Sequence, residues 1–140
     1  MATTTVSYTN DVDRIFDNTQ QITDDLTLTA ADSGKTLFLN AAGGGTVTLP
    51  ALKAGLNFNI LVGAIAPTTA WIIDSAEGDN ISGILVVNGA SVAAVAEDQI
   101  NFVANTAVSG DYIELACDGS AWYVKGVGSA AGSITATDPS

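Results

Sequence analysis

Short runs that alternate apolar and polar residues, separated by turn residues, make up most of this chain from Leu26 onward. The runs recur about every 8 to 12 residues, and no apolar pattern sustains a helix of more than a turn or two, which is typical of a β-sandwich or small barrel. Residues 91–96 alone fit a helix as well as a strand. We therefore expect an all-β domain, a compact antiparallel sandwich or small barrel, with strands at 26–29, 36–39, 46–49, 58–62, 71–73, 84–87, 91–95 and 100–103.

Two dipeptides predict β-hairpins. Asn88-Gly89 and Asp118-Gly119 each lie between two apolar runs, and Gly accepts the positive φ angle that a tight turn requires. The second hairpin joins residues 111–117 to residues 120–125 through a loop of either two or four residues. Both registers leave the same side chains on the outer face, namely Tyr112, Glu114, Tyr123 and Lys125. Both also place the same side chains on the inner face, namely Ile113, Leu115, Trp122 and Val124.

The two ends of the chain differ from the middle. Residues 1–24 are polar, and we interpret them as an arm laid over a partner, with an ordinary first strand of the domain as the alternative. The candidate capsid or subunit contacts of this arm are its isolated apolar residues: Val6, Tyr8, Ile15 and Phe16. Residues 25–127 form the predicted β-domain. Residues 128–140 are small, rich in Gly, Ala and Ser, and predicted to be a flexible tail.

The charge and hydropathy of the chain exclude some classes of partner. The 15 acidic residues outnumber the four basic ones, for a net charge of −11. Such a charge repels nucleic acid, so we expect no nucleic-acid partner. No apolar run approaches the roughly 18 to 20 residues that span a bilayer, and the N-terminus lacks the pattern of a secretory signal, so we expect no membrane partner either. Cys117 stands alone, which excludes an internal disulfide and predicts a small core residue.

Enzymatic motifs are incomplete in this sequence. The chain has no His, the commonest general base and metal ligand. Gly34-Lys35-Thr36 matches the end of a phosphate-binding loop, but Thr29 replaces the first Gly and the segment continues as a strand. Asp32-Ser33-Gly34 matches the aspartic-protease triplet, but it has no second copy and fits a turn. We expect no catalytic residue and no enzyme; a hydrolase with a carboxylate pair is the distant alternative.

Binding motifs are also sparse. Two groups of acidic residues could offer oxygen ligands to Ca²⁺, but neither has the calcium-loop pattern: Asp11, Asp13 and Asp17, and Asp24 with Asp25. We therefore expect no metal site and no cofactor. Tyr112 and Tyr123 are the candidate exposed aromatics that could stack on sugars, because Trp122 points to the core face.

Three stretches carry a resemblance to structural proteins of tailed bacteriophages. They are LTLTAADSGKTLFLNAAGGGTVTLPAL at residues 26–52, EGDNISG at 77–83 with ILVVNG behind it, and DGSAWYV at 118–124. Together they cover roughly residues 26 to 127, and they are most similar to small head-decoration (cement) proteins of marine phages. Related stretches occur in head-fibre and tail-fibre proteins. Residues 1–24 carry no such resemblance.

The resemblance implies a non-enzymatic virion protein on the capsid exterior. Its partner would be the major capsid protein, whose subunit joints it would reinforce, and the family implies a homotrimer. The acidic surface would face solvent and keep neighbouring virions apart. The alternative is a head- or tail-fibre module that contacts a host receptor or glycan, which predicts an exposed aromatic patch.

Overall fold

The computed structural model describes residues 18–139, which form twelve β-strands and one short 3₁₀ turn. No α-helix occurs in this part of the chain. The elements in chain order are β1 (Thr19–Ile22), β2 (Leu26–Thr27), η1 (Ala30–Asp32), β3 (Thr36–Leu39), β4 (Gly45–Thr48), β5 (Asn57–Val62), β6 (Trp71–Asp74), β7 (Ile81–Val87), β8 (Ala90–Glu97), β9 (Gln99–Phe102), β10 (Tyr112–Cys117), β11 (Trp122–Gly128) and β12 (Ile134–Thr137).

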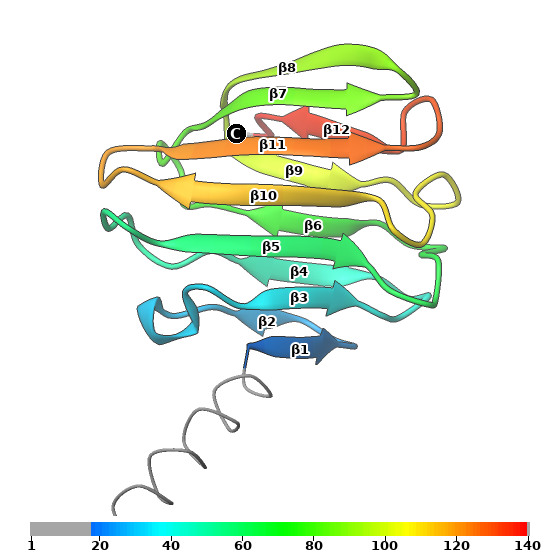
Figure 1. Ribbon diagram of the computed structural model, residues 1–140, viewed down its shortest axis with the longest axis horizontal. Helices are drawn as coiled ribbons and strands as arrows, with labels where there is room; N and C mark the ends of the chain where they lie inside the picture. Colours follow the sequence, from blue (N-terminus) through cyan, green and yellow to red (C-terminus); the bar gives the residue numbers. More distant parts are fainter. Residues whose placement is uncertain (1–17, 140) are drawn as a thin grey trace, which may run out of the picture.

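The strands form two sheets that lie face to face as a sandwich, as Figure 1 shows. Sheet A has seven strands in the order β1-β3-β5-β10-β11-β7-β8, and in Figure 1 it lies in front. Sheet B has five strands in the order β12-β9-β6-β4-β2 and lies behind it. The predicted all-β class is confirmed, and of the two architectures left open the sandwich is the one adopted, since the sheets do not close into a barrel.

The first half of the sandwich, residues 18–74, is the parallel region. Here the chain alternates between the sheets, so that β1, β3 and β5 lie in sheet A while β2, β4 and β6 lie in sheet B. After each strand in the opposite sheet, the chain therefore re-enters the first sheet in the same direction as before. All four ladders within this region are parallel. A strand in the opposite sheet serves as the crossover that a parallel pair requires.

The second half, residues 81–137, is the hairpin region. It contains two antiparallel hairpins, β7–β8 and β10–β11, which pair with one another through the parallel ladder of β11 and β7. Strand β12 pairs antiparallel with β9 in sheet B. Antiparallel ladders join the two regions in both sheets, β5 with β10 and β6 with β9, so that both regions share one core.

The expected direction of the strands is wrong in detail. The sandwich is not antiparallel, because five of its ten ladders are parallel. The spacing of strands along a sequence does not reveal whether the next strand joins the same sheet or the opposite one, and here it joins the opposite one throughout the parallel region.

The domain also extends past both expected boundaries. Strand β1 pairs with β3 although it lies before residue 25, and β12 pairs with β9 inside the expected tail. Ile134 is buried at 1% exposure, which anchors this end of the chain in the core. Val6, Tyr8, Ile15 and Phe16 lie outside the described residues.

Both predicted hairpins are confirmed. Asn88 and Gly89 have φ angles of 51° and 76°, the pair of positive values of a type I′ turn. In the second hairpin Leu115 pairs with Val124 and Cys117 with Trp122, which selects the loop of four residues. The ambiguous run at residues 91–96 lies within strand β8.

The space between the sheets is filled by aliphatic side chains and by both tryptophans, each with 0% exposure. Trp71 comes from the parallel region and Trp122 from the hairpin region. The ring centroids of Trp122 and Phe58 are 6.1 Å apart, a contact that ties β11 to β5 within sheet A. Cys117 is a buried core residue, as expected.

Candidate functional site

The outer face of sheet A, turned away from sheet B, carries a row of apolar side chains across five adjacent strands. The ladder registers place these residues side by side, and we call them the apolar row: Phe38, Leu61, Tyr112, Val127 and Val86. Tyr112, Val127 and Val86 are 40%, 42% and 39% exposed. Strands of a half-solvated sheet normally alternate apolar inward and polar outward residues, so this row departs from the usual pattern.

The next row of the same face holds a pair of charged side chains. Glu114 lies opposite Lys125, and their side chains form an ion pair of 3.1 Å. Ile84, beside Lys125, is 53% exposed, and Asn59 lies on the other side of Glu114. The two charges cancel, so this pair leaves the face neutral on a chain of net charge −11. Glu97, the other charged residue of the sheet A strands, lies at the end of β8 opposite the buried Ile81.

Two open grooves lie on this face, one on each side of the Glu114–Lys125 pair, and each has a volume of about 310 Å³. The Tyr123 groove is lined by Asn57, Asn59, Glu114, Leu115, Ala116, Tyr123, Val124 and Lys125. The Tyr112 groove is lined by Ile84, Val86, Tyr112, Glu114, Lys125, Gly126 and Val127. The ion pair thus separates a groove that holds two asparagine amides from one that holds exposed aliphatic side chains.

The two tyrosines predicted to be exposed are both on this face, but the fold does not bring them together. Tyr112 lines one groove, whereas Tyr123, 51% exposed, lines the other. The Tyr123 hydroxyl donates a hydrogen bond of 3.3 Å to Asp118. The negative charge of Asp118 raises the pKa of Tyr123, so its phenol remains a neutral donor at neutral pH.

Sequence reasoning missed the apolar row because Ile84-Leu85-Val86-Val87 is apolar without interruption. The structure splits this run by strand alternation, so that Leu85 and Val87 are buried while Ile84 and Val86 are exposed. A continuous apolar run in a strand normally indicates burial on both faces. On a strand with one face exposed to solvent, a continuous apolar run instead indicates an exposed apolar surface that a partner can cover.

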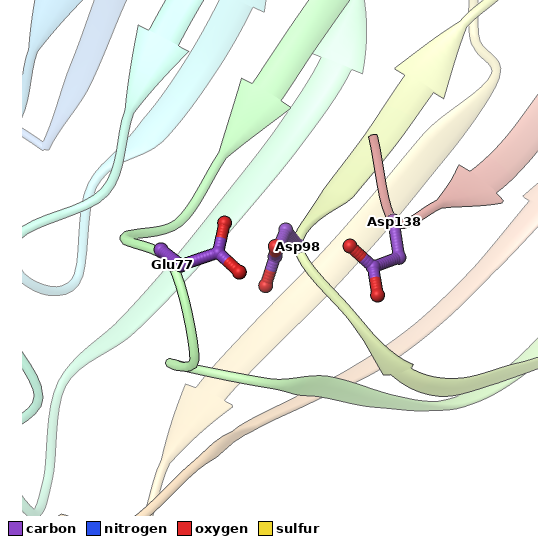
Figure 2. A group of neighbouring side chains, drawn as sticks. All are labelled: Glu77, Asp98 and Asp138. Atoms are coloured by element: carbon purple, nitrogen blue, oxygen red, sulfur yellow. The ribbon is translucent and has the colours of Figure 1, made fainter. Parts of the chain in front are cut away.

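A second cluster consists of three carboxyl groups at the ends of strands (Figure 2). Glu77 follows β6, Asp98 lies between β8 and β9, and Asp138 follows β12. Their carboxylate oxygens lie within 4.8 Å of one another, the one such group of three among residues 18–139. The charge of Asp98, with a smaller contribution from Asp138, raises the pKa of Glu77. Carboxylates at this spacing repel one another, and they are also the ligand type that Ca²⁺ prefers. The three residues are far apart in sequence and match no motif.

The other sequence candidates have structural contacts. Asp25 accepts a hydrogen bond of 2.8 Å from the Thr46 backbone N–H, and Asp24 accepts one from Asp25. Asp32 forms an ion pair of 2.9 Å with Lys35. The hydrogen bond from Lys35, and then that from the Thr29 N–H, lower the pKa of Asp32. Thr36 opens strand β3 rather than a helix, so the Gly-Lys-Thr segment lacks the setting of a phosphate loop.

The comparisons with known proteins find no relative. No protein-family model, curated protein or solved structure matches this chain. In residues 18–139, no helix is long and apolar enough to cross a membrane.

Proposed function

We propose that this chain is a virion structural protein that attaches to the exterior of a phage capsid through the outer face of sheet A. The observation that supports the proposal is the contrast between this face and the rest of the molecule. The face carries one ion pair with no net charge, the apolar row of five exposed or half-buried side chains and the exposed Ile84 beside it, on a protein of net charge −11.

The composition of the face favours a protein partner. The centres of protein–protein interfaces are depleted in charge and enriched in aromatic side chains, as the apolar row is with Tyr112 and Phe38. An ordinary stable contact buries about 800 Å² on each partner. The face crosses seven strands that lie about 4.8 Å apart, so its width of roughly 29 Å suits a contact of that size.

The choice of a capsid as partner depends on the resemblance of residues 26–127 to head-decoration proteins. A protein that spans a joint between major capsid protein subunits adds contact area, and this area must be broken before the joint opens. With the neutral face against the capsid, the acidic groups elsewhere would face solvent and keep virions apart.

The test uses purified virions of the phage that encodes this chain. A variant with Ile84→Ser, Tyr112→Ser and Val127→Ser is expected to lose virion occupancy, measured by quantitative mass spectrometry relative to the major capsid protein. All three side chains are exposed, so the variant should retain its thermal unfolding midpoint. Ile72→Ser, on the outer side of sheet B, is the matched control and should bind like the parent protein. Full occupancy by the triple variant would contradict the proposed face.

The Tyr123 groove supports a second candidate, a fibre module that binds a glycan. Asn57, Asn59 and Glu114 offer donors and acceptors beside the exposed ring of Tyr123. Sugar-binding sites combine such polar groups with an aromatic surface. Glycan-array binding that is abolished by Tyr123→Ala, together with only a few copies per virion, would favour this candidate over decoration.

A further inference from the structure

Strand β8 is an edge of sheet A that lacks the usual protection against pairing. Among the described strands it pairs with β7 alone, and it is eight residues long. The other edge strands, β1, β12 and β2, have four, four and two residues. An edge strand directs alternate N–H and C=O groups away from its sheet, and these groups form a template for another strand.

The composition of β8 leaves this template open. From Ala90 to Val95 the strand has neither a charged residue nor a proline, and Val95 is 72% exposed. Natural edge strands are commonly protected by Lys, Pro, a bulge or shortness. The irregularity in β8 lies at its far end, where Ala96 has a φ angle of 56° and its N–H bonds to Ser82 Oγ at 3.0 Å. The first six residues remain regular.

We propose that β8 pairs antiparallel with β8 of a second copy, about a two-fold axis at Ala93. Two copies of sheet A would then form one continuous sheet. This inference goes beyond the capsid proposal and does not depend on it, because it concerns the edge of the sheet rather than its face.

The register follows from the direction of the backbone groups of β8. Val87 and Ala90 flank the two-residue turn as a hydrogen-bonded pair, so Ala90, Val92 and Ala94 bond to β7, and the N–H and C=O groups of Ser91, Ala93 and Val95 point away from the sheet. An axis at Ala93, the middle of these three, places Val95 opposite Ser91 of the second copy, and all three side chains are exposed on one face. Small side chains at these positions let the two backbones approach.

The distribution of charge along β8 permits a second copy to pair in this register. Two molecules of net charge −11 repel each other, so they can meet only where like charges stay apart. The one charged residue of β8 is Glu97 at its end. Antiparallel pairing about Ala93 places the two Glu97 side chains at opposite ends of the contact, far from each other.

The arrangement is isologous and closes as a dimer, because the same edge serves both copies. It would place the outer faces of the two sheets A side by side. The homotrimer implied by the family resemblance is a different assembly, since three copies cannot share one pair of identical edges.

The test measures the mass of the full chain in solution by sedimentation equilibrium over a range of protein concentrations. We expect twice the monomer mass of 14.1 kDa at the highest concentration. Ala93→Glu and Ala93→Lys each put like charges directly opposite on the two-fold axis. Each is expected to raise the dimer dissociation constant at least about tenfold, equivalent to about 1.4 kcal/mol.

Ala116→Glu is the matched control, because Ala116 is an exposed alanine on the central strand β10 and should leave the mass unchanged. The two Ala93 variants shift the net charge in opposite directions. A higher dissociation constant in both variants would therefore indicate a local contact rather than an effect of net charge. Ala93→Cys should also form an intermolecular disulfide under mild oxidation. A monomer at all concentrations, a trimer, or a dimer whose dissociation constant is unchanged in both charged variants would overturn the proposal.

Discussion

The parallel region and the hairpin region contribute six strands each to the same sandwich, but they are encoded differently. Within the two hairpins of the hairpin region, neighbours along the chain are neighbours in the sheet, and Asn88-Gly89 and the Asp118–Ala121 loop set the pairing. In the parallel region, each strand pairs with one that lies two strands further along the chain. Local turn chemistry therefore specifies two ladders of the hairpin region, whereas contacts between distant residues specify its other two ladders and every ladder of the parallel region.

The two regions also contribute differently to the proposed binding face. On the outer face of sheet A, the exposed apolar side chains Ile84, Val86, Tyr112 and Val127 all come from the hairpin region. The parallel region adds half-buried Phe38 and Leu61 and the amides of Asn57 and Asn59. The hairpin region thus supplies the apolar contact surface, and the parallel region extends the sheet beneath it.

The largest expected effect tests whether the two regions fold as one unit. Leu37→Ala in β3 and Leu85→Ala in β7 each remove a side chain with 0% exposure, at a cost of about 2–5 kcal/mol in free energy of unfolding. Because the regions share one core, either change should lower the stability of both.

Each region contains one buried tryptophan, which makes this prediction measurable. Urea unfolding of the Leu37→Ala protein, followed by fluorescence in Trp71→Phe and Trp122→Phe backgrounds, reports on the hairpin region and the parallel region in turn. Leu37→Ala is expected to lower the midpoint in both backgrounds by a similar amount, each compared with its own background without the Leu37 change. A shift confined to Trp71 fluorescence would mean that the parallel region unfolds alone.

A smaller effect compares the loops of the two regions. Gly44, between β3 and β4, and Gly89, between β7 and β8, have φ angles of 61° and 76°. Alanine at either position pays a left-handed backbone cost of roughly 1–2 kcal/mol. At Gly44 a Cβ would also lie 2.3 Å from the Ala70 carbonyl oxygen, whereas at Gly89 nothing lies within 4 Å.

Gly44→Ala should therefore destabilise more than Gly89→Ala, by about a further 1–3 kcal/mol of overpacking. Gly43→Ala, with nothing within 4 Å and no positive φ angle, is the adjacent control and should change the free energy of unfolding little. Thermal unfolding of the three variants measures the order. Equal losses of stability in Gly44→Ala and Gly89→Ala would show that the loop between β3 and β4 is no more tightly packed than the turn between β7 and β8.

Sequence patterns could predict the strands and the hairpins because these depend on local alternation and on turn residues. The inner face of the last hairpin, with Trp122 and Leu115, followed from a period of two in either register. The parallel ladders could not be predicted, because nothing near Thr36 or Gly45 states which sheet the strand will join. The neutral face escaped prediction for the same reason, since Phe38, Tyr112 and Val86 come into one row only through four ladders.

The next effect concerns Asp32, at the 3₁₀ turn of the parallel region. Asp32→Asn removes the ion pair with Lys35 and weakens the bond to the Thr29 N–H, at a cost of about 1 kcal/mol. The folded pKa of Asp32 lies below its ordinary value of 3.8, so its contribution is present above that pH and is lost as the pH falls through the folded value. Urea unfolding at pH 7 and in acid should show the difference only at pH 7. An equal difference in acid would rule out ionisation as its source.

The smallest effect has the opposite sign and lies where the two regions join. Glu77, between β6 and β7, has a folded pKa above 4.5 because Asp98 and then Asp138 repel its charge. The contribution of Glu77 to stability is therefore fully present below pH 4.5 and is lost as the pH rises through the folded pKa, when Glu77 ionises beside the other two carboxylates.

Glu77→Gln removes that loss, so the variant should unfold at a higher urea midpoint at pH 7 and match the parent in acid. Asp79→Asn, two residues away and outside the cluster, should change neither midpoint in this way. A variant less stable than the parent at pH 7 would show that the three carboxylates attract a cation in solution rather than only repel one another.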